Sequence, residues 1–384
     1  MKVYFDNAAT TPLHPRVFEK MKRFLTEDFG NASSIHSFGR PARVAIEEAR
    51  EIVADFIKAN PSEIYFTSGG TEANNFAVFG IARADFAESR RNQIATSQSE
   101  HHSVLDAFKQ LETEGFSVER LGLHPTSQID FEELKNRLNP NTSFVSLIHI
   151  NNETGAVNPI GEITEKLKLR NIICHADTVQ SFGKATIDIR RMGIDSLCGS
   201  AHKINGPKGT GFVFVKSGTP MSPFLYGGSQ ERNRRGGTEN VAGITGLAEA
   251  VRIAKTEMDY NSSHVTTLKE RFISGLLSMD FTGIRINGGE NSSPYILSLT
   301  FRNEYYANDA ESMLMFLDIN GIAASNGAAC TSGTFRPSHV LLNSGFHAED
   351  ANGSIRFSFG AYNTPKEVDY TLEILDKMRL KFRR

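Results

Sequence analysis

Short apolar segments with strand character alternate with segments of helical periodicity through the first 255 residues of the sequence. The strand candidates are residues 64–66, 93–96, 144–149, 172–176, 196–199 and 211–215. Helical patterns include residues 104–111 and residues 40–58, which have a wide apolar face. Such an alternation restricts the chain to an α/β fold, in which a largely parallel sheet carries helices on its faces.

The pattern changes after a predicted helix at residues 243–258. The remaining predictions are a helix at 268–277, strands at 284–287, 295–301, 322–324 and 355–359, and helices at 310–317 and from 365 to the end. This mixture is typical of a smaller α+β domain. With 384 residues the chain is long enough for two domains. We expect a large domain at 13–257 and a small domain formed by 1–12 and 258–384.

The composition sets expectations about partners and compartment. The net charge is −2, with 39% hydrophobic and 22% charged residues, so no basic surface for nucleic acid is expected. No apolar run approaches the roughly 20 residues that span a bilayer, and the N-terminus lacks a signal-peptide pattern. Three cysteines, Cys174, Cys198 and Cys330, cannot all pair within one chain. We therefore expect a cytoplasmic protein in a reducing compartment, without membrane contact.

Two loops that follow predicted strands have the composition of ligand-binding turns. In residues 67–72, Gly70 and Thr71 precede a helical run, where glycine permits close backbone approach and free N–H groups attract phosphate. For this loop alone, an ordinary strand-to-helix turn is the alternative. In residues 200–209, Lys203 lies between a polar strand end and a Gly-Pro turn, a position that suits a partly desolvated Schiff-base lysine. A solvated surface lysine is the alternative there.

Two further residues place a reactive group at a strand end or in a loop. Asp177 directly follows the predicted strand 172–176, at the sheet edge where α/β proteins bind ligands, although a helix N-cap is the alternative. Cys330 lies among small and glycine residues in 323–334, which predicts an exposed thiol on a mobile loop. An exposed cysteine can be accidental. Cys174 and Cys198 lie in apolar strand contexts and are expected to be inert.

Taken together, these segments resemble the cysteine desulfurase family, within the class V aminotransferases of the fold-type I pyridoxal-phosphate enzymes. The resemblance rests on separated motifs in family order: DNAATTP, TSGGTEANN, SEHHSV, HINNETG, HADTVQS, SAHKINGPKG, the cysteine loop and SIRFSFG. It covers essentially the whole chain. It implies a large domain with a mainly parallel seven-stranded sheet flanked by helices. The smaller α+β domain would carry the catalytic cysteine loop at about 325–337.

The resemblance also implies how the cofactor, pyridoxal 5'-phosphate, is held. Lys203 would bind it covalently, Asp177 would keep its ring nitrogen protonated, and His101 would stack on the ring and take part in catalysis. Asn152 and Gln180 would contact the ring hydroxyl. The phosphate would be held by the helix start at Gly70 and by Thr71, Ser200, His202 and, from a second subunit, Thr238. The last contact makes a homodimer necessary for a complete site.

For the substrate, the resemblance implies that Arg356 clamps a carboxylate, with Asn7, Ala8 and Asn152 in the same pocket. A surface ion pair is the alternative for Arg356. The run Glu100-His101-His102 is compatible with a metal site, but no further ligand set at metal spacing accompanies it, so no metal is expected.

The implied activity is removal of sulfur from L-cysteine, which gives L-alanine and a persulfide on Cys330. Either Lys203 or His101 would remove the alpha proton. The sulfur would pass to an acceptor protein such as an iron-sulfur scaffold. The alternatives are a selenocysteine lyase, another class V aminotransferase, which would not need Cys330, and more remotely a non-catalytic binding protein with this fold.

Overall fold

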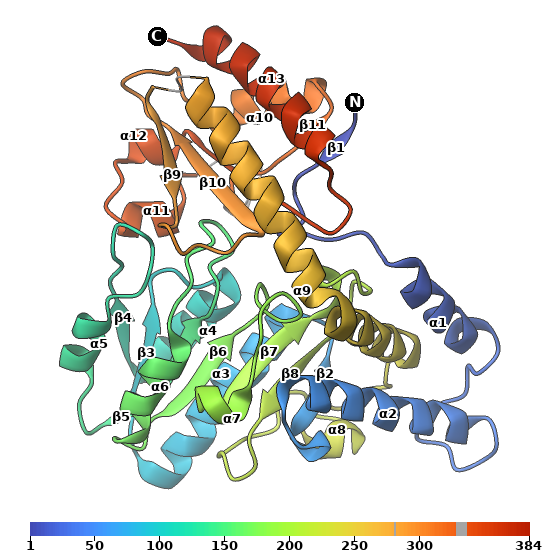
Figure 1. Cartoon of the computed structure of the whole chain (residues 1–384). Coiled ribbons are helices and arrows are strands. Elements are labelled where there is room, and N and C mark those ends of the chain that lie inside the picture. The colour runs from blue at the N-terminus through green and yellow to red at the C-terminus, as the bar shows by residue number, and fades with distance from the viewer. Residues whose placement is uncertain (280–281, 328–335) are drawn as a thin grey trace.

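A seven-stranded sheet forms the centre of the larger lobe (Figure 1). The computed structural model describes residues 1–279, 282–327 and 336–384. The strand order is β2-β8-β7-β6-β5-β3-β4. The bounds are β2 (Ile64–Thr67), β3 (Gln93–Ser97), β4 (Ser117–Leu121), β5 (Thr142–Ile148), β6 (Ile173–Asp177), β7 (Ser196–Ser200) and β8 (Gly211–Val215). Strand β8 runs antiparallel to β2 and β7, and the other pairs are parallel, which confirms the predicted sheet.

Helices cover both faces of this sheet, because successive side chains of a strand point to opposite faces. Along β8, Phe212 and Phe214 enter one hydrophobic core, while Val213 and Val215 enter the other. The first core includes residues of α1 (Pro15–Thr26), α2 (Gly39–Ile57), α6 (Ile160–Lys168) and α9 (Val241–Ser278). The second includes residues of α3 (Gly70–Ser89) and α4 (His102–Thr113). Shorter elements are η1 (Pro61–Glu63), α5 (Phe131–Arg137), α7 (Ile189–Met192), η2 (Ala201–Lys203) and α8 (Gln230–Asn233).

Strand β4 is the element of this sheet that the sequence analysis did not identify. It lies at the edge, paired with β3 alone, and most of its side chains are exposed or half-buried. An edge strand with the sequence SVERL buries too few side chains to show an apolar pattern. The other strands of this sheet lie within two residues of their predicted bounds.

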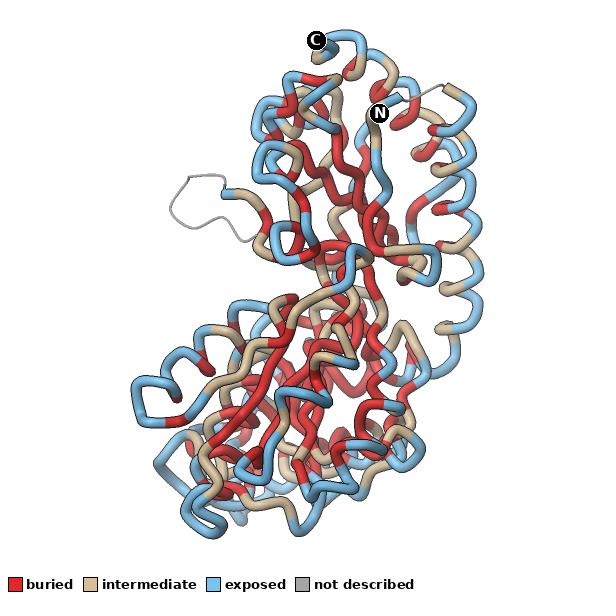
Figure 2. The backbone as a smooth tube through the Cα atoms, turned by 90° about the vertical axis from the view of Figure 1, so that its left-hand side faces the viewer, coloured by how far each residue is buried: buried red, intermediate tan, exposed pale blue. Residues whose placement is uncertain are grey.

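The smaller lobe is built around a three-stranded antiparallel sheet of order β12-β10-β9. Its strands are β9 (Ile284–Asn287), β10 (Ile296–Phe301) and β12 (Ser354–Ser358), and β1 (Val3–Tyr4) pairs in parallel with β11 (Ile322–Ala323). The helices are α10 (Ala310–Ile319), α11 (His339–Asn343), α12 (Ala348–Ala351) and α13 (Pro365–Phe382). A separate hydrophobic core fills this lobe, and buried backbone segments run through its interior (Figure 2). In this core the ring of Phe5 contacts the rings of Phe272, Phe357 and Phe359.

A single helix, α9, runs from one lobe into the other (Figure 1). Two separate helices at 243–258 and 268–277 were predicted, and the structure corrects this to one helix of 38 residues. The polar segment 259–267 interrupts the apolar periodicity but contains no proline or glycine, so the backbone hydrogen bonds continue through it. The expected domain boundary at 257/258 therefore falls inside α9. Among the described helices, none combines the length and the apolar character needed to cross a bilayer.

Candidate active site

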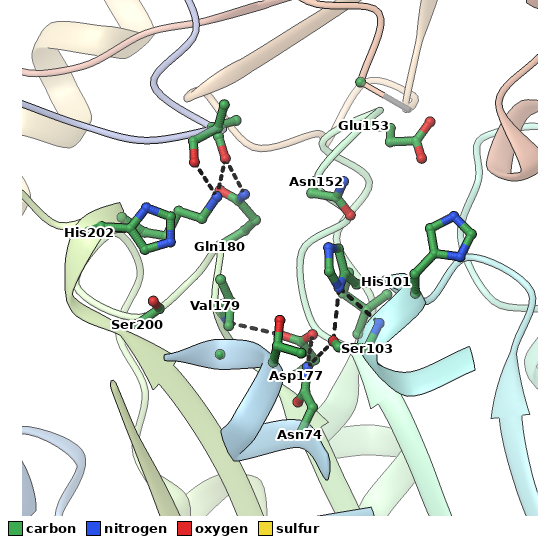
Figure 3. A pocket seen from close by; sticks show the side chains of 18 of the residues that line it. Asn74, His101, Ser103, Asn152, Glu153, Asp177, Val179, Gln180, Ser200 and His202 are labelled. Carbon is green, nitrogen blue, oxygen red and sulfur yellow. Dashed lines mark hydrogen bonds between the residues drawn. The ribbon is translucent and has the colours of Figure 1, made fainter. Parts of the chain in front are cut away.

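A cavity of about 350 Å³ opens at the carboxyl edge of the large sheet (Figure 3). Parallel strands end together at this edge, so the polar residues that follow them gather there. The site residues predicted from the sequence that line it are Ala8, Gly70, Thr71, His101, Asn152, Asp177, Gln180, Ser200, His202, Lys203 and Arg356. Residues of both lobes that lie far apart in the sequence, from Ala8 to Arg356, thus meet in one cavity.

Lys203 lies at the end of the short turn η2, directly after β7. Its Nζ donates hydrogen bonds to the backbone oxygens of Ala8, at 2.6 Å, and Ala9, at 2.8 Å. Burial, and then the charge of Arg356, lowers the pKa of its amine to about 8. A freely solvated surface lysine would have neither this enclosure nor this shift. The amine is thus a nucleophile that is partly neutral near physiological pH.

Asp177 is the last residue of β6 and is only 3% exposed. One carboxylate oxygen accepts from the backbone N of Val179 at 2.9 Å and the other from Asn74 Nδ2 at 2.8 Å. No helix begins at Asp177, since α7 starts only at Ile189. The carboxylate of Asp177 therefore faces the cavity and does not cap a helix, which is the alternative that the sequence offers.

His101 precedes α4 and caps it, since its Nδ1 accepts from the backbone N of Ser103 at 3.1 Å. The hydroxyl of Ser103 lies 2.8 Å from the same nitrogen. Burial is the main cause that lowers the pKa of His101, so the imidazole is neutral at pH 7. A neutral aromatic ring held by a helix start is suited to lie against a flat ligand.

The start of α3 forms a cradle for an anion. Gly69, at its N-cap, has a φ of 152°, which favours glycine, and no side chain caps the first turn. A Cβ on Gly70 would lie 2.7 Å from a methyl carbon of Val179, so only glycine fits against that wall. Opposite, Ser200 Oγ is buried and has no hydrogen-bond partner among the described residues. Free N–H groups and an unused hydroxyl provide donors for a phosphate.

The side chains of Gln180 and His202 contact the N-terminal segment at Ala8 and Thr10. Gln180 Nε2 donates to the backbone oxygen of Ala8 at 2.9 Å, and its Oε1 accepts from Lys184 Nζ at 3.3 Å. His202 Nδ1 lies 3.2 Å from Thr10 Oγ1, and burial lowers its pKa to about 4, so it is neutral. The N-terminal segment, which belongs to the small-lobe core, thereby closes one wall of the cavity.

Arg356 lies on β12 of the small lobe and is 4% exposed, which excludes a surface ion pair. One terminal nitrogen donates to the backbone oxygen of Asn152 at 2.7 Å and the other to Asp6 Oδ1 at 2.8 Å. Its Nε is buried and makes no hydrogen bond within the described part of the chain. The guanidinium is thus fixed in the cavity wall with an unused donor, which suits a carboxylate ligand.

Three of the predicted site residues do not line the cavity as it is described. The amide of Asn7 bonds Ser358 O at 2.9 Å and Asn363 Oδ1 at 3.1 Å, so it fixes the N-terminal segment instead of facing the cavity. Thr238 is exposed and borders a separate hollow of about 120 Å³. Cys330 lies outside the described residues. On either side of it in the sequence, Gly327 and His339 line the cavity.

Comparison with known proteins shows which family this chain belongs to. The model of the family described as "Aminotransferase class-V" matches residues 3–371. The chain belongs to the class-V aminotransferase family. It is 43% identical over 383 residues to "Cysteine desulfurase IscS" of Dictyoglomus turgidum, covering 100% of this chain and 95% of that protein. The enzyme of the same name from Clostridium botulinum strain Hall is 41% identical over 377 residues, with 98% and 94% covered.

Among solved structures, a "NifS-like protein" has a TM-score of 0.90 and 36% identity, and the match covers 98% of this chain and 99% of that one. These findings confirm the cysteine desulfurase family and the fold that the sequence motifs imply. Members of this family depend on pyridoxal phosphate. Neither a selenocysteine lyase nor another class V aminotransferase is favoured by these relatives.

In this class-V aminotransferase, the cavity also includes residues that the sequence analysis did not select. They are Ala9, Asn74, His102, Ser103, Ile148, Glu153, Val179, Ser325, Gly327 and His339. For Asn74 a signal was available, because it lies four residues after Gly70 on α3, and positions i and i+4 of a helix share a face. Within the described residues, no group of three or more His, Cys, Asp or Glu side chains is placed to bind a metal ion.

Proposed function

We propose that this protein is a pyridoxal-phosphate-dependent cysteine desulfurase that converts L-cysteine to L-alanine and leaves the sulfur as a persulfide on Cys330. The observation that carries the proposal is the placement of a half-buried lysine amine, Lys203, and a buried carboxylate, Asp177, in one cavity. The atoms balance, because the thiol and the amino acid together yield the persulfide and alanine. The relatives named above carry the same activity in their names.

The cavity residues fit the cofactor. Pyridoxal phosphate supplies an aldehyde that captures amines and a protonated ring that withdraws electrons from the substrate carbon. Lys203 provides the amine, and Asp177 would hold the ring nitrogen proton. The unpartnered hydroxyl of Ser200 and the uncapped start of α3 would hold the phosphate, together with Thr71.

Asn152, Gln180 and His101 are placed to orient the ring. All three line the cavity, and Gln180 and His101 are held by hydrogen bonds to the protein. Bonds of this kind fix side-chain positions before a ligand binds, which lowers the entropy cost of ordering the site. We assign the ring hydroxyl to Asn152 and Gln180 and the ring face to His101.

Cys330 is the proposed sulfur acceptor. Gly327, three residues before it in the sequence, lines the cavity beside Ser325. A polypeptide extends by at most about 3.6 Å per residue, so the covalent chain allows this thiol to reach the cavity. The buried thiols do not compete, because burial raises the pKa of both Cys174 and Cys198 and keeps them protonated.

The second subunit, the acceptor and the location are further parts of the proposal. Thr238 is exposed and lies outside its own chain's cavity, which suits a role in the phosphate site of a second copy, as the family resemblance implies. We therefore propose a homodimer in the cytoplasm. The persulfide would pass to an acceptor protein such as an iron-sulfur scaffold.

An assay of both products tests the function. The purified protein with bound cofactor is incubated with L-cysteine and a thiol reductant, and alanine and sulfide are measured together. Equal amounts of alanine and sulfide are expected. Product formation that depends on an added keto acid would indicate an aminotransferase. A clear preference for selenocysteine would indicate a lyase, and the absence of both products would indicate a binding protein.

Replacing Arg356 with lysine is expected to weaken substrate binding. Lysine keeps the charge but cannot bond Asn152 and Asp6 and still offer a third planar donor. A hydrogen bond to a charged group contributes about 1.5–3 kcal/mol, so kcat/KM for L-cysteine should fall roughly 10- to 100-fold, mainly through KM. Steady-state kinetics check this, with the exposed Arg302→Lys as the matched control. An equal loss with cysteamine, which lacks the carboxylate, would contradict the assignment.

Capture of the cofactor by the apoprotein should accelerate as the pH rises through about 8, the lowered pKa of Lys203. Below this pKa the amine is protonated and has no free electron pair, whereas above it the neutral amine is the nucleophile. The rate constant, followed by absorbance after mixing with pyridoxal phosphate, should rise about tenfold per pH unit and then level off. A rise that continues to about pH 10, the range of an exposed lysine, would contradict it.

A further inference from the structure

A line of hydrogen bonds joins Asp177 to His101 along the floor of the cavity (Figure 3). The amide nitrogen of Asn74 donates to Asp177 Oδ2 at 2.8 Å and to Ser103 Oγ at 2.9 Å. Ser103 Oγ in turn lies 2.8 Å from His101 Nδ1. The line crosses three elements, α3, β6 and α4, and neither Asn74 nor Ser103 has a part in the proposed function.

The orientation of the Asn74 amide follows from its neighbours. Its Oδ1 lies 3.0 Å from His175 Nε2 and 2.9 Å from Cys198 Sγ, both of which can donate. In the reverse orientation this oxygen would face the carboxylate of Asp177, acceptor against acceptor. The NH₂ group therefore faces Asp177 and Ser103, and each of its two hydrogens has a partner.

The proton positions on Ser103 and His101 follow in turn. Because Ser103 Oγ accepts from Asn74, its own hydrogen is available for His101 Nδ1. The backbone N–H of Ser103 also points at Nδ1, at 3.1 Å. Two donors that converge on one ring nitrogen require a lone pair there. In the neutral ring the proton is then on Nε2, the nitrogen that bonds no described residue.

We infer that Asn74 and Ser103 are positioning residues that hold His101 in its Nε2–H tautomer, so that the ring presents a hydrogen-bond donor to the cavity. The tautomer follows from the hydrogen bonds alone, and only its role in the reaction rests on the proposed function. It distinguishes two candidates for proton removal, because a protonated Nε2 has no electron pair to accept the alpha proton. Lys203 is then the base, and His101 donates to the bound cofactor or substrate.

The charge of Asp177 sets the direction of the line. A buried carboxylate accepts strong hydrogen bonds, so it orients the Asn74 amide, and each following donor points away from Asp177 toward His101. The carboxylate proposed for the ring nitrogen thereby also determines the proton position on His101. Removal of the Ser103 hydroxyl is expected to change His101 while the hydrogen bond from Asn74 to Asp177 stays in place.

Nuclear magnetic resonance of ¹⁵N-histidine-labelled holoenzyme tests the inference, because the ¹⁵N shift distinguishes a protonated from a bare ring nitrogen. The signals of His101 are those absent from the His101→Gln spectrum. In the unsubstituted protein a bare Nδ1 and a protonated Nε2 are expected. In Ser103→Ala, loss of one neutral hydrogen bond should reduce the ratio of the two tautomers roughly 3- to 10-fold. In Ser103→Thr, which keeps the hydroxyl, the ratio should be unchanged.

Asn75→Ala is the matched control for the amide. Asn75 is adjacent on α3, and its Nδ2 donates to the backbone oxygen of Ser103 at 2.9 Å and not to the Ser103 hydroxyl. This variant should keep the tautomer ratio, whereas Asn74→Ala should lower it. Kinetically, Ser103→Ala should lower kcat with little change in KM, since Arg356 and not His101 is assigned to the substrate carboxylate.

A proton on Nδ1 of the unsubstituted protein, or an identical ratio in Ser103→Ala, would overturn the inference. If Ser103→Ala does not fold, the unsubstituted spectrum, assigned with His101→Gln, still decides the tautomer. The expected tautomer in a protein that forms no alanine would refute the proposed function and leave the hydrogen-bond line intact. Alanine formation with the opposite tautomer would do the reverse.

Discussion

Replacing Lys203 with alanine is expected to remove covalent attachment of the cofactor and to reduce alanine formation roughly 100- to 10,000-fold. Two functions are lost together, the amine that binds the aldehyde and the base that removes the alpha proton. The amine suits both, because burial lowers its pKa to about 8 and two backbone oxygens fix its position. Borohydride reduction of the holoenzyme followed by peptide mass spectrometry should locate the cofactor on Lys203.

Lys208 provides the matched control, since it is exposed, lies in the same loop and does not line the cavity. Lys208→Ala should retain the reduced cofactor adduct and the activity. Cofactor trapped on another lysine in the Lys203→Ala protein, with activity preserved, would contradict the assignment.

Replacing Cys330 with alanine is expected to leave the cofactor bound and to suppress sulfide release by roughly 1000-fold or more, because removing a covalent nucleophile is among the largest single losses in enzymes. The visible absorbance of the holoenzyme should be unchanged, since other residues, Lys203 and Asp177 among them, are assigned to the cofactor. After incubation with L-cysteine, mass spectrometry should find the added sulfur in the unsubstituted protein and not in the variant.

Cys174→Ala is the control for the loss of a thiol as such. Cys174 is buried, and burial raises its pKa, so no sulfur chemistry is expected of it. This variant should release sulfide at the normal rate. Undiminished release from Cys330→Ala would refute the role of that residue and require another sulfur acceptor.

Much of the cavity could be predicted from the sequence, because its residues follow strands. Polar side chains at the carboxyl ends of buried strands, as at Asp177 and Ser200, must meet at the carboxyl edge of a parallel sheet. The positions of the buried strands were also predictable, because a strand that is buried on both faces is apolar throughout. Edge strand β4 lacks that burial, and α9 continues through a polar segment that a periodicity argument divides.

By itself, then, the sequence determined the α/β class, the buried strands of the large sheet and the chemical groups available to the site, since these follow from local periodicity and from motifs. Only the tertiary structure decided how those groups are bonded. Lys203 bonds Ala8 across 195 positions, and Arg356 bonds Asp6 across 350. The Asn74 line to His101 likewise depends on contacts between α3, β6 and α4. Burial, pKa and tautomer are set by such neighbours in space, which a linear pattern does not specify.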